Sequence, residues 1–172
     1  MFSSLFEVDT QRETAYLSDY IAFGNGKARP KTIGKIPVYG GNGILSYTES
    51  SNASNVVLIG RVGAYCGSVY LETSDCWVSD NAIFAKSKIS DKEYFDYFLL
   101  RKLNLYNHHV GTGQQLLTQE ILNKIAVNSF DLGDITKFNE YAERVYSTIL
   151  RNKTELDELQ KVSEIVLSKL SA

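Results

Sequence analysis

The chain has 172 residues and a net charge of −2 at pH 7, with 44% hydrophobic and 22% charged residues. This composition is typical of a globular protein and excludes a disordered, collagen-like or disulfide-dense chain. Folding at this length buries about 70% of the surface of the unfolded chain, which is enough for one core but not for two full domains. The near-balanced charge argues against a sequence-blind polyelectrolyte binder and leaves room for a protein with one positively charged face.

The N-terminus carries no recognisable export signal. Residues 1–13 have neither a basic leader nor a long apolar stretch, and no apolar run approaches the ~20 residues of a membrane span. We therefore expect a cytoplasmic protein that contacts no membrane. In a reducing cytoplasm Cys66 and Cys76 are expected to be free and packed as small hydrophobic residues. A zinc site made with His108 and His109 is the alternative, which the spacing disfavours.

Short strands are predicted between residues 36 and 85. Residues 36–39 and 44–47 flank Gly40-Gly41-Asn42-Gly43, whose residues tolerate positive φ and permit a tight turn. The segment 56–59 is apolar throughout, which predicts a buried central strand. Two more strands are expected at residues 68–71 and 82–85.

Helical patterns follow these strands. Ser90 with Glu93 forms a capping-box pattern that opens a helix through residues 93–100. Its aromatic residues lie at helical spacing and are expected to be core, the alternative being a stacking platform: Tyr94, Phe95, Tyr97 and Phe98.

A polar loop at residues 107–115 comes next, before a short helix capped by Thr118. Residues 124–127 are expected to return to the sheet. The segment up to residue 130 therefore predicts one mixed α/β globule.

The sequence changes character near residue 130. Residues 134–170 contain no glycine or proline, and helix formers dominate, which predicts one helix of ~55 Å at the α-helical rise. Residues 1–130 carry 12 basic and 12 acidic groups, and residues 131–172 carry 6 and 8. The predicted fold class is α+β: a small mixed α/β domain at 1–130, followed by one long C-terminal coiled-coil helix at 131–172.

This long helix carries a heptad pattern. A helix of this length cannot hide its whole seam on a domain about 30 Å across, so part of it needs a partner. A helix folded back on its own domain is the alternative. The seam positions have spacings that alternate strictly between four and three residues, as in a coiled coil: Phe138, Ala142, Val145, Ile149, Asn152, Leu156, Leu159, Ser163, Val166 and Leu170.

The seam is symmetric about Asn152. In an antiparallel pair of copies Asn152 faces its own mate, and a buried amide pair of this kind fixes register at some cost in stability. A parallel pair also juxtaposes Asn152, so the pattern leaves the direction open. The antiparallel register matches small residues with small ones and large with large: Phe138 with Val166, Ala142 with Ser163, Val145 with Leu159, and Ile149 with Leu156.

No catalytic arrangement is evident in the sequence. There is no GxSxG motif, and the two histidines are adjacent in a polar segment. The glycine-containing segments 24–27 and 111–114 lack the complete phosphate-binding patterns. We therefore expect a non-enzymatic protein without catalytic residues.

Binding residues are better supported than catalytic ones. Lys27, Arg29, Lys31 and Lys35 fall within nine residues with no acidic residue between them, which suits phosphate contacts, the alternative being a solvated basic loop. Arg61 lies between Gly60 and Gly63 after the buried strand and is the candidate for a rigidly presented guanidinium. The loop 107–115 is either an ordinary polar loop or a base-reading loop, because amide side chains can pair with adenine; its candidates are His108, His109, Thr112, Gln114 and Gln115.

Blocks of the sequence resemble, in order, the target recognition domains of type I restriction-modification specificity (S) subunits. The similarity spans roughly residues 17–170, and the long helix looks like the helical spacer of that family. The blocks are IPVYGGNGI at 36–44, IGRVGAYCG at 59–67, WVSDNA at 77–82, GTGQQLLT at 111–118 and LNKIAV at 122–127.

The resemblance implies a non-catalytic DNA-reading subunit. An S subunit has two recognition domains, each reading one half of a bipartite target, and two antiparallel helices that set their separation and dock two modification (methyltransferase) subunits. S-adenosylmethionine is bound by the modification subunits, so no cofactor is expected in this chain. With one domain and one helix, the chain resembles half an S subunit.

We therefore expect two copies to pair antiparallel and read an interrupted palindrome. The expected partners are double-stranded DNA, a second copy and the modification subunits, with the restriction subunit as a further candidate. Two other interpretations remain open: a coiled-coil adaptor or decoy that binds modification subunits without reading DNA, and a detached recognition domain of a fused restriction-methyltransferase.

Overall fold

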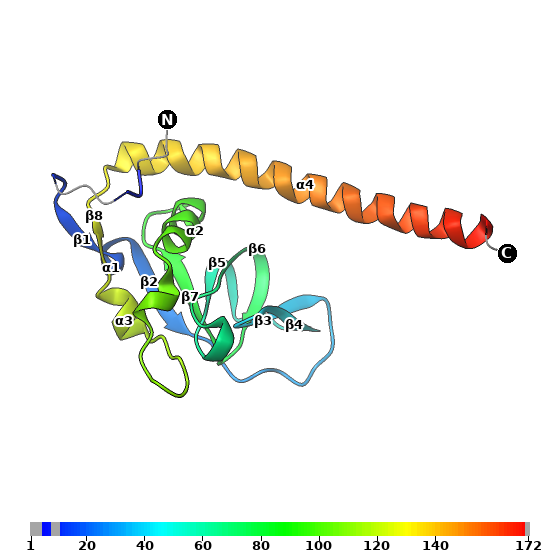
Figure 1. Ribbon diagram of the computed structural model, residues 1–172, viewed down its shortest axis with the longest axis horizontal. Helices are drawn as coiled ribbons and strands as arrows, with labels where there is room; N and C mark the ends of the chain where they lie inside the picture. The colour runs from blue at the N-terminus through cyan, green and yellow to red at the C-terminus, as the bar shows by residue number, and fades with distance from the viewer. Residues whose placement is uncertain (1–4, 8–10, 171–172) are drawn as a thin grey trace.

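A curled sheet domain precedes one long helix in the computed structural model, which describes residues 5–7 and 11–170 (Figure 1). No helix within these residues is both long and apolar enough to cross a membrane. The elements in chain order are β1 (Thr14–Tyr16), α1 (Leu17–Tyr20), β2 (Ile21–Asn25), β3 (Ile36–Gly40), β4 (Gly43–Thr48), β5 (Ala53–Gly60), η1 (Gly63–Tyr65), β6 (Val69–Val78), β7 (Ala82–Ser87), α2 (Glu93–Lys102), η2 (Leu105–His108), α3 (Gln119–Asn123), β8 (Ala126–Asn128) and α4 (Leu132–Leu170).

The main sheet has the strand order β2-β7-β5-β6-β3-β4. All neighbours are antiparallel except β3 and β6, which pair in parallel at Val38–Trp77 and Tyr39–Val78. The predicted hairpin is confirmed, with Gly43 at a φ of +80° closing the β3–β4 turn. The predicted central strand is confirmed as well, because β5 lies between β7 and β6 and Val57, Leu58 and Ile59 have no exposed surface.

Two strand predictions need correction. β6 runs for ten residues, well beyond the predicted end at residue 71, because Glu72, Asp75 and Cys76 continue to pair with β5 and its last two residues pair with β3. Residues 124–127 do not return to the main sheet, since β8 pairs instead with β1 in a separate two-stranded sheet. Alternating residue patterns indicate a strand but carry no information about which strand is its neighbour.

The start of α2 is also different from the prediction. Ser90 does not cap the helix: its Oγ donates to Asp91 Oδ2, and the N-cap residue Lys92 makes no side-chain cap bond. The acceptor for the helix N-terminus comes from Asn139 of α4, whose Oδ1 accepts from Phe95 N at 3.0 Å and whose Nδ2 donates to Asp91 O at 2.9 Å. A residue of the long helix thus satisfies an N-H group that a local capping box was expected to satisfy.

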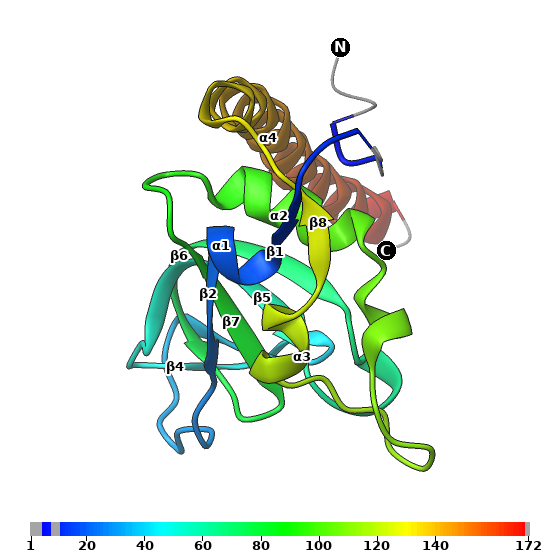
Figure 2. The same ribbon diagram turned by 90° about the vertical axis from the view of Figure 1, so that its left-hand side faces the viewer.

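The core joins the sheet, α2 and the first turns of α4 in successive layers (Figure 2). Phe95 is buried, and its ring lies 5.1 Å from that of Phe130 and 6.0 Å from that of Phe138. Ile135, Phe138 and Ala142 of α4 belong to the same buried cluster. The expectation that the aromatic residues of α2 are core is confirmed: Phe95 and Tyr97 are buried, and Tyr94 and Phe98 pack against the cluster.

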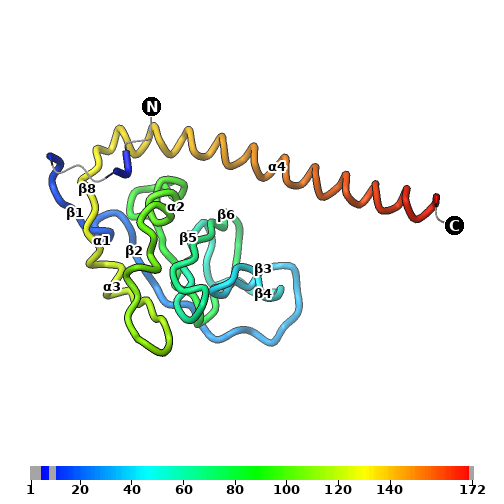
Figure 3. Tube along the Cα trace, in the orientation of Figure 1, coloured from blue at the N-terminus to red at the C-terminus, as the bar shows by residue number. Residues whose placement is uncertain are grey.

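Beyond Tyr146 the long helix leaves the domain. Tyr146 is half-buried, with its ring 5.7 Å from Tyr94 and 5.6 Å from Tyr97. Residues 147–170, called here the outer segment of α4, are all exposed and extend past the sheet (Figure 3). The helix therefore does not fold back on its own domain: of the ten seam positions only Phe138 and Ala142 are buried, and the remaining eight are exposed.

Candidate nucleic-acid interface

Two loops that carry most of the predicted binding residues lie on the side of the domain that faces away from α4. One loop, residues 26–35, connects β2 to β3, and a second, residues 109–118, connects η2 to α3. Both loops project from this side in Figures 1 and 2, so the views agree on the arrangement. Segments that are about 80 residues apart in the sequence are thereby placed on one surface.

The basic loop 26–35 is anchored at its ends. Lys27 N donates to Val78 O at 3.0 Å, and the Thr32 and Thr48 hydroxyls are 2.7 Å apart. At Gly34 a Cβ atom would lie only 2.3 Å from Thr48 O, so only glycine fits the close approach to β4. The four basic side chains of this loop are exposed: Lys27, Arg29, Lys31 and Lys35.

Arg61 leaves the end of β5 on a fixed backbone. Its N donates to Asn81 O at 3.0 Å, and its carbonyl oxygen accepts from Leu117 N at 2.9 Å and from Cys66 Sγ at 3.4 Å. The side chain is half-buried, and within the described residues its Nε is buried without a hydrogen-bond partner. Hydrogen bonds with three neighbouring segments therefore fix the backbone that carries the Arg61 guanidinium.

The loop 109–118 is pinned to the same segment as Arg61. Val110 and Leu116 exchange two backbone hydrogen bonds of 2.9 Å, and Gly63 N donates to Gln115 O at 3.0 Å. The structure thus brings Arg61 and the half-buried Gln115 together. Thr112 and Gln114 are exposed at the loop tip, beside Gly111 with a φ of +93°.

The two histidines lie at the beginning of this loop. His108 is exposed at the end of η2. His109 is half-buried, its Nδ1 lies 2.6 Å from Tyr106 O, and its ring centroid lies 4.7 Å from that of Tyr106. His109 therefore helps to hold the loop, while His108 is presented to solvent.

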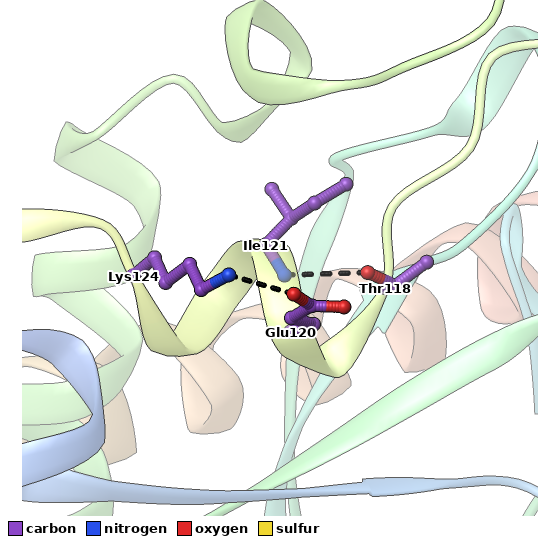
Figure 4. A network of polar contacts seen from close by, with 4 residues as sticks. All are labelled: Thr118, Glu120, Ile121 and Lys124. Atoms are coloured by element: carbon purple, nitrogen blue, oxygen red, sulfur yellow. Dashed lines mark hydrogen bonds and ion pairs between the residues drawn. The ribbon is translucent and has the colours of Figure 1, made fainter.

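The far end of the loop is fastened by α3 (Figure 4). The predicted cap is confirmed: Thr118 Oγ1 accepts from Ile121 N at 3.2 Å. One turn along, Lys124 Nζ lies 2.6 Å from Glu120 Oε1, and this hydrogen bond lowers the pKa of the exposed Glu120 carboxyl. A single well-capped helical turn therefore defines where the loop ends.

Sequence reasoning missed part of this surface. Tyr65 of η1 and Asn81 in the β6–β7 turn are exposed; Asn81 O accepts from Arg61 N, and Tyr65 O lies against the preceding residue, Gly60. Both lie inside the sequence blocks at 59–67 and 77–82, but nothing in those blocks shows that the two turns meet. Their proximity depends on the pairing of β5 with β7, which is a tertiary feature.

The cysteines lie inside the domain and are free. Burial raises the pKa of the Cys66 thiol and raises that of Cys76 to about 12. A protonated thiol is a poor metal ligand. Across residues 5–7 and 11–170 no group of three or more histidine, cysteine or acidic side chains is arranged to hold a metal ion.

Comparisons with known proteins agree with this architecture. The family model of the type I restriction modification DNA specificity domain matches residues 18–160. Comparison with curated proteins gives no significant match.

Among solved structures, the type I S subunit from M. genitalium is 16% identical with a TM-score of 0.72, covering 89% of this chain and 44% of that one. A chain from a structure titled for the complex assembly and conformational transition of the type I R-M system is 14% identical with a TM-score of 0.62. The match covers 91% of this chain and 45% of that one. The HsdS subunit from Thermoanaerobacter tengcongensis is 13% identical with a TM-score of 0.58, covering 84% and 40%. These likenesses show a shared fold, and the chain spans less than half the length of each structure.

Proposed function

Since the chain belongs to the family of type I restriction-modification DNA specificity domains, we propose that it is the subunit that selects the DNA sequence on which such a system acts. It reads double-stranded DNA in the cytoplasm and catalyses no reaction itself. The observation that carries this proposal is the placement of the basic loop 26–35 and the polar loop 109–118 on one surface, away from α4.

The two loops divide the work on DNA. The exposed charges of Lys27, Arg29, Lys31 and Lys35 contact phosphates and orient the domain, because phosphate contacts carry position and not sequence. The groove contacts come from Arg61, Thr112, Gln114 and Gln115, with His108 and His109 beside them. Arginine suits guanine and glutamine suits adenine, and each bidentate contact contributes about 1–3 kcal/mol of discrimination.

The outer segment of α4 supports a second part of the proposal, that two copies pair. It exposes large apolar side chains such as Ile149 at 55%, Leu156 at 59% and Leu159 at 59%. Burying each of these side chains against a partner contributes about 1.5–3 kcal/mol to the free energy of association. An exposed apolar stripe of this kind is typical of a protein-protein interface. An identical copy is the partner proposed here because the seam is symmetric about Asn152.

Two features of α4 guide how we propose that such a pair fits. Phe138 and Ala142 are occupied by the chain's own core, so a partner helix reaches the neighbouring stripe of α4. A groove on that stripe is lined by Tyr141, Arg144, Val145, Thr148 and Ile149. In the antiparallel register centred on Asn152, Leu159 of the second copy lies opposite Val145, and Ser163 lies level with Tyr141. The C-terminal third of one helix thus enters the groove of the other.

A two-fold pair presents the same reading surface twice, and its target is an interrupted palindrome. The paired helices set the distance between the half-sites and dock the modification subunits, which bind S-adenosylmethionine. The restriction subunit joins this complex. With a net charge of −2, the chain alone binds DNA with low affinity, and the modification subunits increase the affinity of the complex for DNA.

Mapping DNA methylation in cells that express this chain with its modification subunit tests the proposal. We expect a gapped palindromic methylated motif that disappears when the chain is omitted. An asymmetric motif would contradict self-pairing and point to a different half-subunit as partner. Methylation without any sequence motif would contradict the reading function itself.

A further inference from the structure

Three turns of the sheet domain meet beside Arg61 and lock one another in place. A Cβ atom on Gly60 would lie 2.1 Å from Tyr65 O, so the end of β5 tolerates only glycine. Gly41 of the β3–β4 turn lies so close that a Cβ there would be 3.6 Å from both Asn81 O and Tyr65 Cβ. The β3–β4 turn, η1 and the β6–β7 turn therefore form one packed unit, called here the turn cluster.

Hydrogen bonds fix the backbone at the two exposed positions of this cluster. The carbonyl oxygen of Tyr65 accepts from Ser68 N at 3.1 Å and from Ser68 Oγ at 2.8 Å. The carbonyl oxygen of Asn81 accepts from Arg61 N at 3.0 Å, and Ala82 N donates to Ser79 O at 3.0 Å across the same turn. Hydrogen bonds to their carbonyl oxygens thus hold the backbones of Tyr65 and Asn81 in place.

Their side chains, in contrast, reach the solvent. Tyr65 is 50% exposed, Asn81 is exposed, and neither side chain forms a hydrogen bond with any other residue that the structure describes. Asn52 shows the opposite case nearby: its Nδ2 donates to Val78 O at 3.0 Å and its Oδ1 accepts from Val78 N at 2.7 Å. A fixed backbone that carries an unused polar side chain is the arrangement expected of a recognition residue, because little freedom is lost on binding.

We infer that Asn81 and Tyr65 are additional base-reading residues that act beside Arg61 on an A·T pair of each half-site. This inference rests on the proposed function. An asparagine amide pairs bidentately with N6 and N7 of adenine in the major groove. The ring of Tyr65 supplies apolar contact for the methyl group of thymine, as aromatic side chains do at this edge. The base pair read by Asn81 adjoins the one read by Arg61, since their backbones are directly bonded.

The inference is tested in the assembled complex of the chain with its modification subunits, by competition binding against a library of target variants. Asn81→Ala removes only the amide, since the fold uses the backbone carbonyl of this residue. We expect a preference for adenine at one position of each half-site to fall by about 5- to 100-fold, with binding to unrelated DNA and complex assembly unchanged. Tyr65→Ala is expected to weaken the preference for the A·T pair at the same position, through its thymine, and Tyr65→Phe to retain it.

Thr73→Ala is the matched control. Thr73 is exposed on the same sheet but borders a hollow beside Glu93 and Asn139, on the side of α2 and α4. Its removal should leave the motif unchanged. If the wild-type complex selects a motif and the Asn81 and Tyr65 variants select the same one, this inference is wrong and the proposed function stands. A wild-type complex that selects no motif overturns both.

Discussion

The sheet domain and the outer segment of α4 differ in how their apolar side chains are buried. In the domain, close backbone approaches such as those at Gly34 and Gly60 leave room only for glycine, and Phe95, Ile135 and Leu100 are fully or almost fully buried. In the outer segment every residue from 147 to 170 is exposed, including large aliphatic side chains. The domain is specified by contacts within the chain, whereas the outer segment leaves its apolar side chains exposed to solvent.

Deleting residues 147–170 separates the two regions most sharply. Because Ile135, Phe138, Asn139 and Ala142 are part of the core, a cut before the helix would unfold the domain, while a cut after Tyr146 spares it. We expect the shortened chain to fold and to be monomeric by sedimentation at concentrations where the full chain is dimeric. A shortened chain that still forms dimers would show that the outer segment is not the interface.

Substitutions in the basic loop and at Arg61 are expected to change DNA binding in different ways. Arg61→Ala should flatten the preference among target sequences by about 1–3 kcal/mol. Lys31→Ala should weaken binding to all DNA alike and reduce the slope of log K against log salt by about 1. Titrations of the assembled complex at several salt concentrations distinguish these results. Identical behaviour of the two variants would show that this division of roles is wrong.

Asn139 fastens the first turns of α4 to the start of α2, and Asn139→Ala should loosen this contact. The substitution leaves the buried Phe95 N-H without an acceptor and removes the donor to Asp91 O, at a cost of about 1–3 kcal/mol in the free energy of unfolding. Urea denaturation measures the loss. Gln160→Ala, an exposed change on the outer segment, is the control and should stay within about 0.5 kcal/mol. Equal stabilities for the two variants would contradict the capping role.

Asp96 makes the stability of the domain depend on pH. Burial raises the pKa of its carboxyl from 3.8 to about 8, and the charge of Glu93 adds to this. Between these values the folded state holds a proton that the unfolded state has released, so this contribution to stability is complete below pH 4 and falls as the pH rises toward 8. Asp96→Asn should flatten this dependence and stabilise the protein by on the order of 2 kcal/mol at pH 8. Denaturation at pH 5 and pH 8 checks it, and an unchanged slope would contradict the account.

Substitution of Asn152, the asparagine of the seam, is expected to have the smallest effect on stability. Asn152→Leu should raise the melting temperature by a few degrees, about 1–2 kcal/mol, because an amide pair at a seam position is replaced by apolar contact. The same change should broaden the distribution of oligomers, since register is no longer fixed. Sedimentation of the variant with the same species distribution as the wild type would count against the seam assignment.

Local signals in the sequence were sufficient for much of the domain. The β3–β4 hairpin, the apolar β5, the cap at Thr118 and the long helix are each determined by residues within a few positions. The cap of α2 by Asn139 and the pairing of β8 with β1 were missed because they join segments far apart in the chain.

The candidate site divides in the same way. Arg61 and the basic loop are recognisable as charged residues in glycine-bearing turns. That Arg61 contacts Asn81 and lies beside Gln115 depends on how β5, β7 and the loop 109–118 meet, and no local pattern encodes it. The heptad seam likewise predicts a coiled-coil helix, but not that its first two positions are buried in the core of the domain.

The distance between two copies of Ser168 tests most directly whether the outer segment is completed by an identical, antiparallel neighbour. Ser168 is exposed near the end of α4, and a spin label on Ser168→Cys avoids the buried Cys66 and Cys76. In the antiparallel register centred on Asn152 the two labels are separated by about 48 Å along the helix axis, from the helical rise of 1.5 Å per residue. A dipolar distance near that value in the full-length protein is the predicted result. A distance near 10 Å, which is the spacing of parallel helices, or the absence of any dipolar coupling would contradict the account.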